Sequence, residues 1–264
     1  MRRWRKIKTP RDTSSVQSVD RALHILNLLK ENVDGLGITE LSNRMELAKS
    51  TVHRLLSSLK NQGFVRQDPL SERYLLGLKL IELGSIVSQS LEIRKIANPI
   101  MSRLVQETGE TSHLVVLEDG EVVYIEKIES PYTIRMYSLI GKRAPVHCTG
   151  VGKAIIAHIP ESDVRKIVEQ KGLKKFTENT ITTIDDLFAN LQEIREKGYS
   201  LDKEEHEPGI YCVAAPILNH NGESVAGLSV SGPTMRMDEE KVKFCMDRVV
   251  FYAREISKHL GFRG

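Results

Sequence analysis

Ile38–Gln62, with the sequence ITELSNRMELAKSTVHRLLSSLKNQ, is the stretch that decides the fold of the N-terminal third of the chain. Apolar residues recur in its second half at spacings of three and four, which predicts an amphipathic helix that starts near Lys49 or Ser50. Its first half predicts a shorter helix capped by Thr39, and a tight turn joins the two helices. The predicted buried face of the second helix consists of Val52, Leu55, Leu56 and Leu59.

The opposite face of this second helix is polar and basic. A helix that buries one stripe and offers short polar or basic side chains on the other is arranged like the recognition helix of a helix-turn-helix domain. Such a pair of helices also occurs in α-rich domains that bind no DNA, so both interpretations stay open on this stretch alone. The side chains expected in the major groove are Lys49, Ser50, Thr51, His53 and Arg54.

The residues that follow favour DNA binding. Residues 64–76 predict a β-hairpin, with a turn at Asp68-Pro69 and a second strand at Tyr74 to Leu76. A helix-turn-helix followed by a hairpin is a winged helix. We expect Arg44, Arg66 and Arg73 to contact DNA phosphates.

Charge is shared unevenly along the chain. Residues 1–78 contain 14 Lys and Arg against 8 Asp and Glu, whereas the whole 264-residue chain has a net charge of only +3. A basic N-terminal third and a mildly acidic remainder fit a nucleic-acid-binding module joined to a domain that does not touch nucleic acid. The predicted segments are a basic arm (1–15), a winged-helix domain (16–77), a linker helix (78–90) and a second domain (91–264).

The region from Gly77 to Gln106 predicts long helical structure, with Gly84 as a candidate kink and Pro99 as a kink or a new helix start. Beyond it the pattern changes to strands. A hairpin is expected around Asp119-Gly120, and another strand at residues 133–140. Further predicted strands are 199–201, 211–218 and 224–231, and further predicted helices are 149–159, 161–171, 184–197 and 238–260. This order predicts an α+β domain with one antiparallel sheet.

The cysteine count and the hydropathy favour a cytoplasmic protein. The three cysteines, Cys148, Cys212 and Cys245, form no C-x-x-C pair, which argues against a disulfide framework. The sequence shows no apolar run long enough to span a membrane, and no apolar segment of a signal peptide follows the basic N-terminus.

Two segments predict a small-molecule site. In the first, Gly150 and Val151 run into a helix, whose free N–H groups and positive dipole end suit an anion. In the second, Ser229 and Ser231 alternate with apolar residues, so both hydroxyls face one side of a strand. Together they suit a small carboxylate. The alternative is that the glycines serve turns and the serines are satisfied core hydroxyls.

Two other kinds of site stay open at this point. His147, Cys148, Asp202 and His206 can be drawn as a nucleophilic set, but chain neighbours on a strand point to opposite faces, so we do not expect an enzyme. A zinc site from His147, Cys148, His206 and Cys212 has suitable residue types but lacks the close ligand spacing of structural zinc sites.

Three stretches make the chain resemble the IclR family of bacterial transcription regulators. They are VQSVDRALHILNLL with the helix-turn-helix and RYLLG, then PVHCTGVGKAIIA, and then YSLDKEEHEPGIYCVAAPILNHNGESVAGLSVSGP. The resemblance covers about residues 16–260 and implies a winged helix-turn-helix, a linker helix and a GAF-like effector-binding domain. It also implies homodimers, often paired into tetramers, that mostly repress operons for carbon compounds by binding operator DNA.

The resemblance further implies a small organic-acid effector and no permanent cofactor. Carried over residue by residue, Gly150 and Val151 form the floor of the pocket, Ser229 and Ser231 bind the carboxylate, and Asp202, Ile210 and Cys212 line the sides. Cys148 stands where some relatives have alanine, and some relatives hold zinc in this region. A zinc-dependent regulator is therefore the alternative to a regulator controlled by an organic acid, with an enzyme as the third class.

Overall fold

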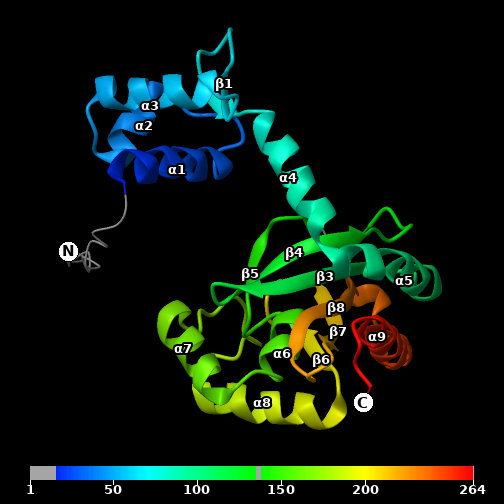
Figure 1. Cartoon of the computed structure of the whole chain (residues 1–264). Helices are drawn as coiled ribbons and strands as arrows, with labels where there is room; N and C mark the ends of the chain where they lie inside the picture. The colour runs from blue at the N-terminus through cyan, green and yellow to red at the C-terminus, as the bar shows by residue number, and fades with distance from the viewer. Residues whose placement is uncertain (1–15, 135–137, 264) are drawn as a thin grey trace. The chain divides into compact units, whose positions relative to one another are not determined.

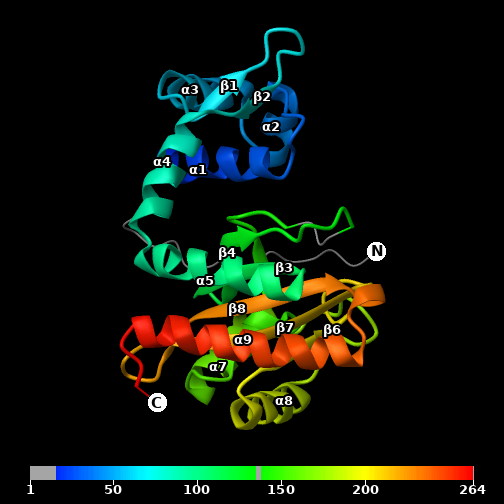
Figure 2. The ribbon, with the colours of Figure 1, turned by 90° about the vertical axis from the view of Figure 1, so that its right-hand side faces the viewer.

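The chain forms two compact units, residues 1–88 and 89–264. The computed structural model describes residues 16–134 and 138–263, so the predicted basic arm (1–15) lies outside the described residues. Figures 1 and 2 show the two units from two directions.

The first unit is a winged helix-turn-helix, as predicted. Its core contains Leu41 of the first helix of the motif and Val52 and Leu56 of the second, all fully buried. Apolar residues of the wing, Val65 and Tyr74, close this core from one side. Its elements are α1 (Gln17–Lys30), α2 (Ile38–Met45), α3 (Lys49–Asn61), β1 (Val65–Gln67) and β2 (Tyr74–Leu76).

The turn between α2 and α3 is tight because one residue adopts a left-handed conformation. Glu46 has φ 54°, and the Ser42 hydroxyl donates a 2.6 Å hydrogen bond to the Leu47 carbonyl. The predicted helix cap is wrong by two residues. The N-cap of α2 is Gly37, whose N–H donates to Glu40, instead of Thr39.

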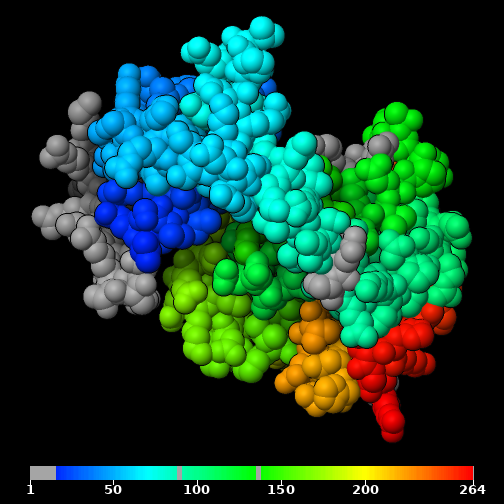
Figure 3. Space-filling view, turned by 45° about the horizontal axis from the view of Figure 1, so that its top comes forward, coloured from blue at the N-terminus to red at the C-terminus, as the bar shows by residue number. Residues whose placement is uncertain are grey.

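The wing is a short antiparallel hairpin in which Val65 pairs with Leu76. An isolated bridge between Leu36 and Tyr74 ties it to the start of the helix-turn-helix. Leu70 at the tip is 94% exposed, and Figure 3 shows the tip (cyan) projecting from the surface of the first unit.

The long helical region is two helices, α4 (Lys79–Ser90) and α5 (Glu92–Thr108). They separate at Leu91, which has an extended backbone with ψ 97°. The helix start predicted as one alternative at Pro99 is therefore wrong, because Pro99 lies inside α5, and Gly84 lies inside α4.

The second unit is built on a six-stranded antiparallel sheet of order β5-β4-β3-β8-β7-β6, which confirms the predicted α+β fold class. Its strands are β3 (Thr111–Glu118), β4 (Glu121–Ile128), β5 (Arg143–Pro145), β6 (Ser200–Lys203), β7 (Ile210–Leu218) and β8 (Ser224–Pro233). Its remaining helices are α6 (Gly150–Ile156), α7 (Glu161–Lys171), α8 (Ile184–Lys197) and α9 (Glu239–His259), with a 3₁₀ turn at Thr234–Arg236. The strand predicted at 133–140 is wrong in its described part, where residues 133–134 and 138–140 are not strand.

Helices cover both faces of this sheet. On one face, α5 and α9 pack on residues such as Val213, Leu228 and Val230. On the other face, α6 packs on the sheet and α8 packs on α6 (Figures 1 and 2). Since side chains alternate along a strand, Ser229 and Ser231 face the α6 side while Leu228 and Val230 face the α9 side. The two serines therefore face the same side of the strand, as predicted, and both are buried there.

Leu56 is a core residue whose truncation should destabilise the first unit. It is fully buried, so Leu56→Ala is expected to lower the free energy of unfolding of this unit by about 2–5 kcal/mol. Leu70→Ala, at the exposed wing tip, is the matched control and should stay within about 0.5 kcal/mol of wild type. Urea unfolding of both variants measures the difference, and equal losses would contradict this core assignment.

Candidate functional site

The face of α3 predicted to contact DNA is open to solvent. Lys49, Ser50, His53 and Arg54 are exposed, and Thr51 is half-buried at the edge of the face. Val52 and Leu56 on the opposite side are fully buried, which fixes the rotation of the helix about its axis. The helix therefore presents one polar, basic face to a partner.

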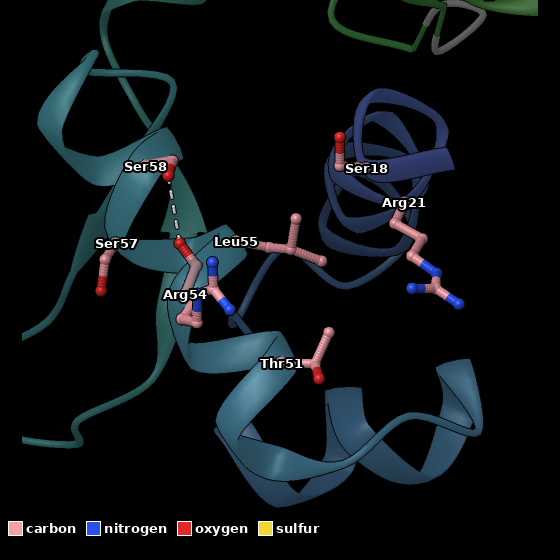
Figure 4. A pocket seen from close by; sticks show the side chains of 7 residues that line it. All are labelled: Ser18, Arg21, Thr51, Arg54, Leu55, Ser57 and Ser58. Atoms are coloured by element: carbon pink, nitrogen blue, oxygen red, sulfur yellow. Dashed lines mark hydrogen bonds between the residues drawn. The ribbon is translucent and has the colours of Figure 1, made fainter. Parts of the chain in front are cut away.

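A shallow depression of about 450 Å³ lies between α1 and α3 (Figure 4). Arg54 from α3 and Arg21 from α1 both line it, and hydroxyl groups stand around them. Cationic and hydroxyl groups of this kind suit either a DNA phosphate or the edge of a base. Sequence patterns missed Arg21, which is half-buried on α1. The hydroxyl-bearing residues are Ser18, Thr51, Ser57 and Ser58.

The three arginines predicted to contact phosphates differ in their surroundings. Arg44 at the end of α2 and Arg66 in β1 are exposed. Arg73 instead donates two hydrogen bonds, of 3.0 and 2.9 Å, to the Gly35 carbonyl and forms a 3.0 Å ion pair with Glu40. Arg73 therefore holds the wing against the start of α2.

In the second unit, all the residues predicted to bind an effector line one internal cavity. They come from distant parts of the sequence and meet between the start of α6, the sheet, and the loop that follows β6. The predicted residues in its lining are Gly150, Val151, Asp202, Ile210, Cys212, Ser229 and Ser231. Tyr124, Thr149, His206 and Glu207 complete it.

The start of α6 forms one wall of this effector cavity. Thr149 caps the helix: its hydroxyl accepts from the Gly152 N–H at 3.3 Å and donates to the Pro145 carbonyl at 2.7 Å. A Cβ on Gly150 would lie 3.1 Å from the Cys212 sulfur, and one on Gly152 would lie 2.5 Å from the Val146 Cα. Glycine at 150 therefore lets the start of α6 lie close to β7, and glycine at 152 lets it lie close to Val146.

The sheet forms the opposite wall. Cys212 pairs with Ser231, and Ala214 pairs with Ser229, so the thiol and both hydroxyls stand together on the α6 side. Burial raises the pKa of the Cys212 thiol to about 12, and the nearby Asp202 adds to this, while the two serine hydroxyls oppose it. The thiol is therefore neutral near pH 7 and leaves the wall free of negative charge at this point.

A buried ion pair lies next to the cavity. Lys153 of α6 is 1% exposed, and its Nζ lies 2.5 Å from Oε1 of Glu205. Glu205 in turn donates its backbone N–H to the Asp202 carboxylate at 2.8 Å. Burial raises the pKa of Asp202 to about 7 and also raises the pKa of Glu205, although Lys153 opposes both shifts.

The cavity is almost closed. The space open to the centre of a water molecule is about 10 Å³, roughly enough for a single water. A ligand larger than water must therefore displace part of the wall when it enters.

Four lining residues were missed as effector-site candidates, of which His206 was considered only for a metal or nucleophile site. Thr149 was detectable as the polar residue before a glycine-rich helix start. Tyr124 reaches the cavity from β4 through an irregular register next to Leu114 and Val115, which a regular alternation does not anticipate. Glu207 lies in the loop after β6, where no periodic pattern indicates direction.

The zinc and nucleophile alternatives gain no support from the geometry. Cys148 Sγ lies 3.7 Å from Nδ1 of His206, but the His147 ring is hydrogen-bonded to the Lys174 carbonyl instead. Within residues 16–134 and 138–263, no three His, Cys, Asp or Glu side chains are grouped so as to hold a metal ion. Burial raises the pKa of the Cys148 thiol to about 12, which makes it a poor nucleophile.

Comparison with known proteins gives matches to both units. The IclR helix-turn-helix domain matches residues 18–69, and the bacterial transcriptional regulator IclR C-terminal domain matches residues 86–258. The chain belongs to the IclR family of bacterial transcriptional regulators. It is therefore a helix-turn-helix transcriptional regulator, and the family resemblance inferred from its motifs is confirmed.

Several IclR-family proteins align over almost the full chain. The regulator KdgR of Escherichia coli K12 is 42% identical over 248 residues, which cover 94% of each protein. The transcriptional repressor IclR of the same strain is 35% identical and covers 97% of this chain and 94% of its own length. The crystal structure of Thermotoga maritima IclR superimposes with a TM-score of 0.76 at 36% identity, covering 93% of this chain and 99% of that one.

These relatives are transcriptional regulators, which makes a non-enzymatic role the better account of the second unit. In the described residues, no helix is both long and apolar enough to cross a membrane.

Asp202 is expected to make stability depend on pH. Its ordinary pKa is 3.8 and its folded pKa is about 7, so between these values only the folded state keeps the proton. Stability should therefore fall as pH rises from about 4 to about 7. Asp202→Asn keeps an acceptor for the Glu205 N–H but removes the charge. As pH rises from 4 to 8, the free energy of unfolding of wild type should therefore fall by about 1–4 kcal/mol relative to that of this variant.

Urea unfolding at several pH values measures this difference. Asp163→Asn on α7, whose side chain is 47% exposed, is the matched control and should follow wild type. Parallel pH profiles for wild type and Asp202→Asn would contradict the assignment of a protonated Asp202.

Proposed function

We propose that this chain is an operator-binding repressor of a carbon-catabolic operon. A small organic acid bound in the effector cavity lowers or raises its affinity for operator DNA. The observation that carries the proposal is the convergence of the start of α6, two serine hydroxyls and Asp202 on one enclosed cavity. The proposal assigns DNA binding to residues 16–77, the effector to residues 91–264, and the connection to the linker at 78–90, in a cytoplasmic protein.

In this proposal α3 enters the major groove. Lys49, Ser50, Thr51, His53 and Arg54 face the bases, because they occupy the side of α3 opposite the buried stripe. Arg44 and Arg66 contact phosphates from exposed positions on either side of that helix in the sequence. We assign Arg73 a structural role, since its guanidinium is engaged with Gly35 and Glu40.

The effector is a small acid whose carboxylate accepts hydrogen bonds from Ser229, Ser231 and the N–H groups at Gly150 and Val151. Ile210 and Tyr124 supply apolar contact. Because the cavity is nearly closed, the acid must stabilise a state in which the walls have moved apart. Such a ligand changes operator affinity only if the open and closed states differ in their DNA affinity.

Relatives support both parts of this proposal. One, 34% identical to this chain, is the acetate operon repressor of Salmonella typhimurium. Another, 26% identical, is an IclR homolog from Microbacterium hydrocarbonoxydans in complex with 4-hydroxybenzoate, an organic acid. We therefore expect no permanent cofactor, and we favour regulation by an organic acid over regulation by zinc.

We further propose that the first unit forms homodimers, which can pair into tetramers. Large apolar side chains are exposed on α1 and around the start of α4: Val19 and Leu23 on α1 are each 53% exposed, Leu78 just before α4 is 74% exposed, and Ile81 on α4 is 70% exposed. Exposed apolar side chains that gather in a patch often mark a contact between proteins. A second copy of this chain is the partner that we assign to these side chains.

Arg54→Ala is expected to weaken specific DNA binding by about 1–3 kcal/mol while leaving binding to random DNA nearly unchanged. Arg54 is exposed on the polar face of α3, where a side chain that reads a base should stand. The operator is first selected from a random duplex library with the full-length protein, and affinities are then measured by fluorescence anisotropy. Lys30→Ala, an exposed cation at the end of α1, is the control. An equal loss on specific and random DNA would make Arg54 a phosphate contact.

Ser231→Ala is expected to abolish the thermal stabilisation that an effector acid gives. Thermal unfolding against a panel of small organic acids identifies the effector, because a ligand at a hundredfold excess over its Kd adds about 2.7 kcal/mol. Ser224→Ala, near the other end of β8, is the control that should keep the response. The panel is repeated with a chelator, and stability lost to the chelator with no acid giving a shift would replace the acid by a metal.

A further inference from the structure

A second cavity lies in the second unit and is lined by residues of the β4–β5 edge of the sheet, of α7 and of the segment 172–176. Figure 1 shows where these strands and α7 lie in the fold. The cavity's space for the centre of a water molecule is about 230 Å³, far larger than that of the effector cavity. Its walls are mostly apolar, from Val146, Ile167, Val168, Leu173 and Phe176. An apolar cavity with a few polar groups is the usual form of a small-molecule site.

His147 is the buried polar group of this second cavity. It is 3% exposed, and its Nε2 lies 3.0 Å from the Lys174 carbonyl. A carbonyl only accepts, so Nε2 must carry the proton, and Nδ1 of the neutral ring is then an acceptor. In the described part of the chain Nδ1 has no hydrogen-bond partner. A ligand that fills the cavity next to His147 is therefore best matched by a hydroxyl donor.

Lys174 is the cation of the second cavity. Its Nζ lies 5.4 Å from the centre of the Phe176 ring, and among residues 16–134 and 138–263 no carboxylate lies within ion-pair distance of it. The other lysine of the lining, Lys171, is already paired with Glu121 at 3.0 Å. One cation without an acidic partner, next to an aromatic ring and aliphatic walls, matches a compact aromatic body with one carboxylate.

We propose that this cavity is a second ligand site, separate from the effector cavity, which takes a single-ring hydroxy-aromatic carboxylate. The ring packs between Phe176 and the aliphatic wall, the carboxylate pairs with Lys174, and the hydroxyl donates to Nδ1 of His147. The proposal involves no covalent step, because the site only binds its ligand.

The second cavity is connected to the effector cavity by direct contacts. The Phe176 ring packs edge-on against His206, which lines the effector cavity, with centroids 5.0 Å apart. Thr177 and Thr180 donate hydrogen bonds of 2.6 Å each to the carbonyls of Glu204 and Glu205. A ligand that orders the segment 172–176 therefore also orders the loop that holds Asp202 and His206. This coupling rests on the effector role proposed above, whereas the second site itself does not.

The test is calorimetric titration of the full-length protein with 4-hydroxybenzoate, compared with benzoate. Wild type should bind 4-hydroxybenzoate at least threefold more tightly than benzoate, because only the former offers the hydroxyl. Lys174→Met should weaken binding at least tenfold. Lys175→Met is the matched control, an adjacent exposed lysine that pairs with Glu178, and it should bind as wild type does.

Ser231→Ala separates the two cavities. If it leaves 4-hydroxybenzoate binding unchanged while Lys174→Met weakens it, the second site is supported, whatever becomes of the proposed effector function. No binding by wild type at 5 mM, or equal binding by wild type and Lys174→Met, overturns the second site. Loss of binding only in Ser231→Ala also overturns it, because the acid then occupies the effector cavity.

Hydrogen exchange tests the coupling. In wild type, adding 4-hydroxybenzoate should slow the exchange of the backbone amides of residues 204–207. In Lys174→Met, adding it should leave their exchange rates unchanged. Binding without slower exchange in this loop overturns the coupling.

Discussion

The buried ion pair between Lys153 and Glu205 is the interaction on which the effector cavity depends. Lys153 belongs to α6 and Glu205 to the loop after β6, so the pair fixes two walls of the cavity relative to each other. Such a pair adds little net stability, but removing one partner leaves an uncompensated buried charge, at about 3–5 kcal/mol. Glu205 also donates its N–H to Asp202. The charge of Lys153 thus positions Asp202, even though Lys153 does not line the cavity.

The covered sheet explains why polar residues can form this site at all. Both faces of the six-stranded sheet are packed by helices, so a hydroxyl on either face is removed from water and requires a partner. The partners of Ser229 and Ser231 are the Cys212 thiol and, in the proposed function, the ligand that enters the cavity. The alternation that buries Leu228 and Val230 under α9 also places the serines at the cavity. Fold stability and ligand recognition are therefore set by one strand register.

Sequence patterns predicted most of this arrangement because its parts repeat over short distances. The helix over residues 184–197 and the serine alternation in β8 follow from local periodicity, and the structure confirms both. The failures are of two kinds. The break at Leu91 has no proline or glycine to mark it, since Pro99 is accommodated inside α5. The strand expected at 133–140 followed from the strand pattern of this region, but residues 133–134 and 138–140 are not strand. Arg73 shows the limit for side chains: its charge suggested DNA, while its position beside Gly35 and Glu40 is a matter of tertiary structure.

The closed effector cavity indicates how the two ends of the chain can be linked. With space for about one water, the cavity must gain volume when an acid binds, and the energy for this comes out of the binding energy. An acid that binds equally well to open and closed walls would regulate nothing, however tightly it bound. Regulation therefore requires that the opened state of the α6–Glu205 wall be also the state with altered DNA affinity. Among the described residues, α4 carries the chain from the first unit to the second, so in the proposed mechanism this difference passes along that helix.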